Sequence, residues 1–128
     1  MKEIKYDDVP SGEIAKDQHM KAKFIYDQIS NLQNSEASEW SYIILLRNII
    51  NNRNLDLIKY VLNLHTYTKK QQMEALDGIG IYESNLHIMK YFAEKEVASS
   101  LLILLALGVA RHRKDIDMIK YFESKVLN

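Results

Sequence analysis

Cysteine is absent from this chain of 128 residues, and proline occurs only once. The lack of cysteine excludes disulfides, thiolate zinc sites and cysteine nucleophiles. It also fits a reducing compartment, so we expect a cytoplasmic location. The single proline lies with one of the four glycines in residues 7–13 (DDVPSGE), a composition that predicts a loop.

Neither sign of charge is in excess, because 17 basic residues face 17 acidic ones and the formal net charge is zero. Proteins that bind nucleic acids usually carry a basic excess, since neutralising phosphates supplies much of their affinity. The balance therefore disfavours a nucleic-acid partner.

Long hydrophobic runs are also missing. Residues 1–10 (MKEIKYDDVP) lack the apolar centre of a secretory signal. The most apolar run, residues 97–110, is shorter than the roughly 20 residues that span a bilayer. We expect no membrane partner, and we interpret this run as a buried helix.

Three similar octets recur at intervals of about 30 residues. They occupy residues 54–61 (NLDLIKYV), 85–92 (NLHIMKYF) and 115–122 (DIDMIKYF). Each opens with Asn or Asp, whose side chain caps helix N-termini well. Apolar residues then recur at spacings of three and four, which place them on one helix face. The shared lysine falls on the opposite face, and the shared tyrosine at the rim of the apolar face.

A second predicted helix precedes each octet. These helices cover residues 40–50, 71–81 and 101–111, and short polar links (NNR, YES and HRK) join them to the octets. Helices joined so closely form αα-hairpins, and one hairpin per period is typical of a stacked solenoid. Gly108 aligns with Gly78, which we interpret as a point of close approach between helices. The fold prediction is all-α, a short right-handed stack of antiparallel helix–turn–helix repeats.

The first 36 residues are less regular and predict an N-terminal capping segment. Residues 16–31 predict a helix whose inward side chains are Met20, Phe24, Ile25 and Ile29. Ser35 or Ser38 would cap the next helix, and Trp40 is assigned to the core. We expect a single domain, residues 1–128, that leaves no room for a tethered activity. Its segments are 1–36, 37–65, 66–95 and 96–128.

The stretch RNIINNRNLDLIKYVLN, residues 47–63, resembles an ankyrin repeat. The second helix of ankyrin units commonly reads Gly or Asn, Leu, acid, two aliphatic residues, Lys, an aromatic residue or Leu, then Leu. Residues 54–61 are similar to this pattern, and the resemblance covers residues 38–126. The Thr-Pro-Leu-His and Gly-Ala-Asp signatures are absent. The resemblance implies ankyrin-like helical hairpins without the β-hairpin fingers, and a binding scaffold rather than a catalyst.

No patterned set of catalytic or metal-binding residues was found. The four histidines, His19, His65, His87 and His112, lack the spacing of metal ligands. No serine lies in a G-x-S-x-G elbow, and residues 78–80 (GIG) lack the Gly-Lys-Ser/Thr that completes a phosphate loop. We therefore predict no enzyme, no catalytic residues, no cofactor and no metal.

The leading hypothesis is a small module that binds and neutralises or regulates a protein partner. Helical immunity proteins of bacterial toxin systems are similar in size and in lack of chemistry, so a toxin domain is the most concrete partner. Interfaces favour Tyr, and acidic residues would speed the capture of a basic toxin. The predicted partner-binding residues are Glu36, Glu39, Tyr42, Tyr67, Glu74, Asp77, Tyr82 and Glu83.

Two alternatives stay open. The first is a regulatory protein associated with nucleic acids, which would use basic residues of the turns. These residues are Lys69, Lys70, Arg111, Arg113 and Lys114. The second is an enzyme whose site the sequence does not reveal, such as a pair of carboxylates brought together by the fold.

Overall fold

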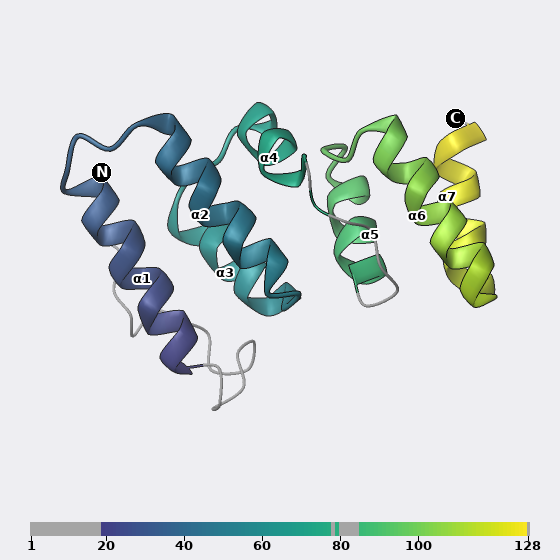
Figure 1. Ribbon diagram of the computed structural model, residues 1–128, viewed down its shortest axis with the longest axis horizontal. Helices are drawn as coiled ribbons and strands as arrows, with labels where there is room; N and C mark the ends of the chain where they lie inside the picture. Colours follow the sequence, from purple (N-terminus) through teal and green to yellow (C-terminus); the bar gives the residue numbers. More distant parts are fainter. Residues whose placement is uncertain (1–18, 78, 80–84, 128) are drawn as a thin grey trace. The chain divides into compact units, whose positions relative to one another are not determined.

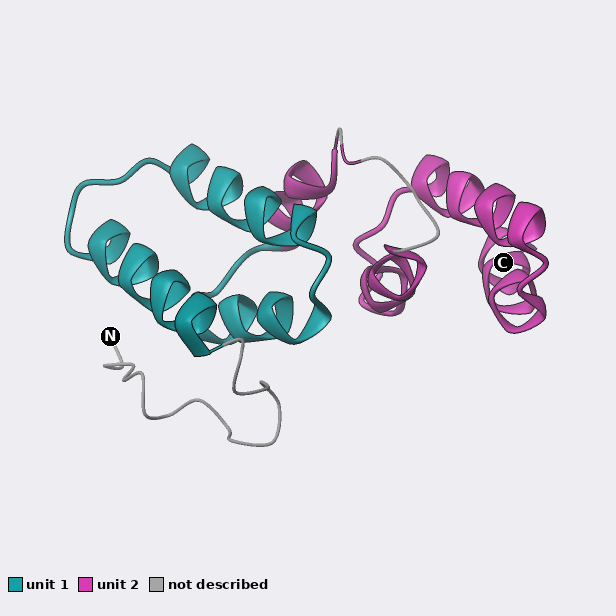
Figure 2. Ribbon diagram, turned by 60° about the horizontal axis from the view of Figure 1, so that its bottom comes forward, with its two compact units in different colours: residues 1–68 teal, residues 69–128 magenta. Residues whose placement is uncertain are grey.

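The computed structural model describes residues 19–77, 79 and 85–127 (Figure 1). These residues form seven α-helices and no strand, which confirms the prediction of an all-α protein. The chain divides into two compact units, Met1–Thr68 and Lys69–Asn128 (Figure 2). Unit 1 contains α1 (His19–Gln33), α2 (Glu39–Asn51) and α3 (Leu55–Leu64). Unit 2 contains α4 (Lys69–Leu76), α5 (Leu86–Glu94), α6 (Ser100–Arg113) and α7 (Ile116–Leu127).

The three octets begin helices where the sequence predicts them. Before α3, the Oδ1 atom of Asn54 accepts a hydrogen bond from the backbone N–H of Leu57 at 3.3 Å. Before α7, the Oδ1 atom of Asp115 accepts one from the N–H of Met118 at 3.2 Å. Asn85 holds the same place before α5, but its side chain makes no capping bond. The cap prediction is confirmed at two of the three positions.

Unit 1 is built around α3, which packs against both α1 and α2. The buried side chains are mostly branched aliphatics, whose full burial stabilises a fold by about 1.5–3 kcal/mol each. They are Ala22, Ile25 and Ile29 of α1, Ile43, Leu46, Ile49 and Ile50 of α2, and Leu57, Ile58, Tyr60, Val61 and Leu64 of α3. Tyr60 is buried together with its hydroxyl, although its position predicts a hydroxyl at the rim.

The assignment of Met20 and Phe24 to the core is wrong. Their exposed fractions are 85% and 61%, whereas Ile25 is buried as expected. At 100° per residue, Ala22 and Ile25 share a face, and Met20 and Phe24 lie on nearly the opposite one. The small side chain of Ala22 completes the inward stripe that the sequence pattern assigned to larger residues.

Trp40 is also outside the core, with 51% of its surface exposed. The buried stripe of α2 is centred on Leu46 and Ile50, about 110° around the helix from Trp40. Arg47, two turns further along, lies over the indole, with its guanidinium carbon 5.5 Å from the ring centroid. Trp40 therefore belongs to an exposed flank of α2.

In unit 2, α6 packs closely on α7, and α5 packs against both. Phe92 of α5 and Phe122 of α7 are fully buried in this core. The helices of the second and third octets, α5 and α7, also contact each other, because the Tyr121 hydroxyl donates a hydrogen bond to the Lys90 carbonyl at 3.4 Å. The Lys90 ammonium lies 5.2 Å from the centroid of the Tyr121 ring.

The helix that precedes the second octet, α4, is shorter than predicted. The sequence predicts a helix over residues 71–81, whereas α4 ends at Leu76, and neither Asp77 nor Ile79 is helical. A glycine inside a helix costs about 1 kcal/mol relative to alanine, and positions 78 and 80 are both glycine. This cost explains the early end.

The prediction that α6 is buried is wrong for half of its surface. Leu102, Ala106 and Ala110 are buried, but Leu101, Leu104 and Leu105 are exposed. Gly108 lies on the exposed side, and a Cβ atom added to it would meet no atom within 4 Å. The interpretation of Gly108 as a point of close approach is therefore not supported within the described part of the chain.

Candidate functional site

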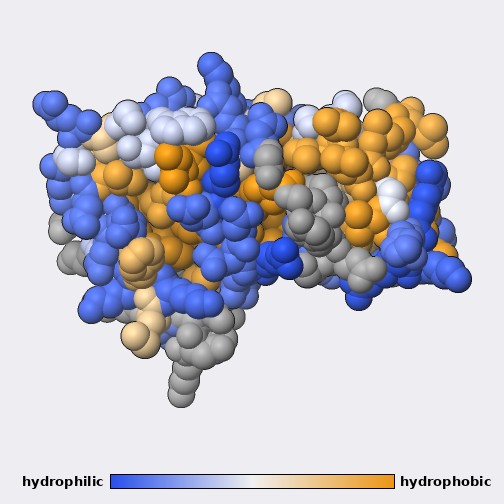
Figure 3. Space-filling model, viewed as in Figure 1, coloured by the Kyte–Doolittle hydropathy of each residue, from blue (hydrophilic) through white to orange (hydrophobic). Residues whose placement is uncertain are grey.

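A groove between α1 and α2 forms a concave surface in the described part of unit 1. Its volume is about 370 Å³, and residues of α1, α2 and α3 line it. The lining residues are Met20, Lys21, Phe24, Ile25, Gln28, Leu45, Asn48, Ile49, Asn52 and Leu57. Figure 3 shows apolar surface between α1 and α2. Small-molecule pockets start at about 300 Å³, so this groove can enclose several apolar groups.

The groove has an apolar floor and an exposed apolar rim. Ile25, Ile49 and Leu57 form the floor and are buried, whereas Met20 and Phe24 stand exposed at the rim. The other lining residues include three amides and one charged residue, Lys21. The apolar surface of such a rim stays in contact with water until a partner covers it. Removing that surface from water is favourable.

The groove lies at one end of the α1–α2 pair. It takes its α1 residues from the first ten positions of that helix and its α2 residues from the last turns and the cap. Glu36 and Glu39, two of the predicted acids, are exposed where the chain passes from α1 to α2. At 1.5 Å per residue, Glu39 is about 9–20 Å along α2 from the groove residues. These acids could steer a partner but do not line the groove.

Tyr42 and Tyr67, two other predicted residues, come together with His65 in unit 1. The rings of Tyr42 and His65 stack with centroids 4.1 Å apart, and Tyr67 meets His65 edge to face at 5.0 Å. The Tyr67 hydroxyl donates a hydrogen bond to the Tyr42 carbonyl at 2.8 Å. Tyr67 is buried, and Tyr42 and His65 are half-buried, so this aromatic cluster ties the chain after α3 to α2.

Burial shifts the ionisation of the aromatic cluster. Desolvation lowers the pKa of His65 and, with a smaller repulsion from Tyr42, raises the pKa of Tyr67 far above its usual range. Both shifts favour the neutral forms near neutral pH. The cluster therefore behaves as an uncharged packing element rather than as an acid–base pair.

A second exposed apolar flank lies on α2. Trp40 and Ile44 are both exposed, and Arg47 covers one face of the indole. Trp and Arg are enriched among the residues that contribute most to protein interfaces. This flank adds to the apolar surface that unit 1 presents to solvent.

The remaining predicted residues belong to unit 2 or lie outside the description. Glu74 is half-buried in α4, and Asp77 is exposed just after it. Tyr82 and Glu83 lie outside the described residues. Glu74 and Asp77 therefore lie in a different unit from Glu36 and Glu39.

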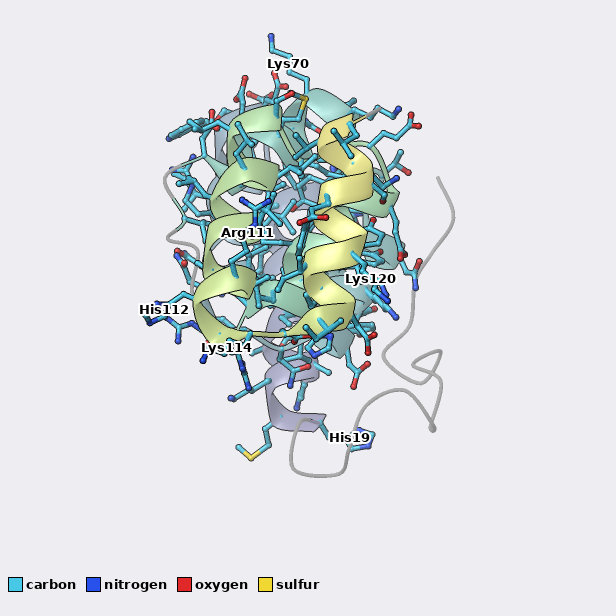
Figure 4. All side chains as sticks on the ribbon, turned by 90° about the vertical axis from the view of Figure 1, so that its right-hand side faces the viewer. His19, Lys70, Arg111, His112, Lys114 and Lys120 are labelled. Carbon is cyan, nitrogen blue, oxygen red and sulfur yellow. The ribbon has the colours of Figure 1, made fainter. Side chains whose placement is uncertain are left out.

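The basic residues of the nucleic-acid alternative are exposed and fall in two groups, at the start of α4 and at the end of α6. In Figure 4, Arg111, His112 and Lys114 lie near one end of α6, and Lys70 lies at the other end of the view. Lys69 pairs with Glu96 at 3.8 Å, and Arg111 pairs with Glu123 at 3.2 Å. Among the described residues, this arrangement gives no continuous basic track along which a phosphate backbone could bind.

Two further findings concern the described residues only. Among them, no three His, Asp or Glu side chains converge in a way that could hold a metal ion. None of the described helices has the length and apolar character needed to cross a membrane.

The chain matches no family model, no curated protein and no solved structure. The candidate site is therefore identified from the geometry of its residues.

Sequence reasoning missed Met20, Phe24 and Ile44 as exposed residues. The available signal was the spacing of Met20 and Phe24, four residues apart on the face opposite the stripe formed by Ala22, Ile25 and Ile29.

Proposed function

We propose that this protein is a non-enzymatic binding module that holds an apolar segment of a protein partner in the α1–α2 groove. The observation that carries the proposal is the pair of exposed side chains, Met20 and Phe24, above a floor of buried aliphatics. Proteins that bind an amphipathic helix present a hydrophobic groove of this composition. Methionine suits such a surface because its side chain adapts to different shapes.

The groove indicates the chemistry of its occupant. Apolar side chains spaced three or four residues apart on a partner helix would cover Phe24 and reach Ile49. Lys21 is the one charged residue among the described lining residues, so a carboxylate beside the apolar face of the partner would complement it. The amides Asn48 and Asn52 can hydrogen-bond to polar groups at the edge of the occupant.

We further propose that binding neutralises or regulates the partner, as in a small immunity or inhibitor protein of a bacterial toxin system. The stack of ankyrin-like helical hairpins belongs to this proposal. It is supported by the α2–α3 and α6–α7 packing and by the contact of Tyr121 with Lys90 between successive repeats. Stacked helical repeats present extended surfaces to partners.

Affinity capture from the source cells, followed by mass spectrometry, tests the groove. The informative variant is Phe24→Asp, and the matched control is Met73→Asp, which charges another exposed apolar residue, on α4. Circular dichroism must show that both variants fold. The proposal expects a partner that wild type and Met73→Asp retain and that Phe24→Asp binds at least about tenfold less tightly, a loss of ~1.4 kcal/mol. Equal capture by Phe24→Asp would exclude the groove.

The predicted acids are tested separately by charge reversal at Glu74 and Asp77. A basic partner should then associate more slowly, and the difference should shrink as salt is added, because exposed charges act mainly on the association rate. An association rate that does not change would reject the role of these two acids in steering.

A further inference from the structure

The outer face of α6 is apolar and exposed. Leu101, Leu104 and Leu105 are 65%, 51% and 48% exposed, and they follow the spacing of a single helix face. The opposite face packs against α5 and α7. Figure 3 shows apolar surface over α6. A helix that is hydrophobic all round is usually buried all round, so this leucine face lacks a partner within the described residues.

Gly108 continues the leucine face one turn further. A Cβ atom at this position would meet nothing within 4 Å, so no neighbour in the described part of the chain requires glycine. Glycine on an apolar helix face allows another chain to approach the backbone closely. Gly108 lies seven positions after Leu101, so a large residue and a small residue stand at the two ends of the same face.

We propose that the leucine face binds the α6 helix of a second copy of this chain, with the two helices antiparallel. A two-fold axis between positions 104 and 105 sets Leu104 against Leu105 of the partner subunit and Leu101 against Gly108 of the partner subunit. The face then complements itself, as a symmetric dimer requires. Each Leu101 fills the space that the opposite glycine leaves.

Charges at the two ends of α6 select the antiparallel arrangement. Exposed basic residues, Arg111 to Lys114, stand at its C-terminal end, and the exposed acids Glu94 and Glu96 flank Lys95 before its N-terminal end. Within one copy Arg111 pairs with Glu123 and Glu96 with Lys69, but exposed pairs of this kind contribute little and can exchange partners. An antiparallel pair brings the acids of one copy near the basic end of the other, whereas a parallel pair brings like charges together. Opposed helix dipoles favour the same arrangement.

The contact is small, because α6 has 14 residues and is about 21 Å long. Interfaces of this size belong to the weak, exchanging class. We expect a monomer–dimer equilibrium that depends on concentration, visible by sedimentation velocity between about 10 µM and about 1 mM. Leu105→Glu should abolish the dimer, and Met73→Glu, which charges an exposed residue of α4, should leave it intact. Thermal melts at low concentration check that both variants fold.

Disulfide trapping tests the arrangement directly, because the chain has no cysteine of its own. A mixture of Leu101→Cys and Gly108→Cys chains should crosslink under mild oxidation at least about tenfold faster than either variant alone, since a disulfide needs Cα atoms within about 7 Å. Met73→Cys serves as the control for random collision. Equal rates in all samples, or a wild-type chain that stays monomeric at about 1 mM, would overturn the dimer. Faster crosslinking of each variant with itself would overturn the antiparallel arrangement.

Discussion

Gly108 offers a prediction about stability that can be calculated from the structure. Replacing it with alanine removes the backbone freedom that makes glycine unfavourable in a helix, a difference of about 0.8–1.0 kcal/mol. The new methyl group meets no atom within 4 Å, so the substitution adds no clash and almost no burial. Gly108→Ala should therefore stabilise the monomer by about 1 kcal/mol.

The size of the shift in Tm also reports how the chain unfolds. Unfolding entropy is about 2.1 cal/mol/K per residue, so 1 kcal/mol raises Tm by about 4 °C if all 128 residues unfold together. If only Lys69–Asn128 unfolds in the transition, the same change raises Tm by about 8 °C. Thermal melts followed by circular dichroism, at concentrations where the chain is monomeric, measure the shift. A Tm that falls would show that Gly108 packs against a neighbour, which would refute the reasoning.

Three further predictions concern single contacts. Tyr67→Phe removes the donor to the Tyr42 carbonyl and should cost about 1 kcal/mol in urea unfolding; a loss below about 0.3 kcal/mol would show that the bond contributes nothing. Burial lowers the pKa of His65, so the unfolded chain takes up its proton first. The contribution of His65 to the free energy of unfolding should therefore be fully present above about pH 6.5 and decline as the pH falls below this value. His65→Phe should remove that decline in thermal melts over a pH series. Asp115→Ala deletes the cap on the Met118 N–H and should cost about 1 kcal/mol, whereas Asp115→Asn should keep most of it; equal urea midpoints for the two variants would contradict the capping role.

Much of the helical pattern could be predicted from local chemistry. The starts of α3 and α7 follow from the capping side chains of Asn54 and Asp115, which act over three residues and need no tertiary context. The early end of α4 could also have been predicted, because the cost of two glycines in close succession is local. The pairing of helices across unit boundaries and the ankyrin-like stack stay predictions.

The exposed surfaces could not be predicted from the same information. A pattern shows which residues are apolar, but the neighbouring helices decide which apolar stripe is covered. On α1 the covered stripe includes Ala22, which left Phe24 outside, and on α6 both faces are apolar and only one is covered. Tyr67 shows the opposite error, because the sequence predicts an exposed residue in the link after α3. Its side chain is instead buried and hydrogen-bonded to the Tyr42 carbonyl.

Site-specific photo-crosslinking from the groove tests the central claim most directly. A photoreactive phenylalanine analogue at position 24, introduced into the chain in its source cells, places the probe at the rim of the groove. The same analogue at position 73 is the control, because Met73 is exposed on α4. The account predicts one dominant crosslinked protein from position 24 that is absent from position 73. No crosslinked protein at position 24, or the same products from both positions, would contradict it.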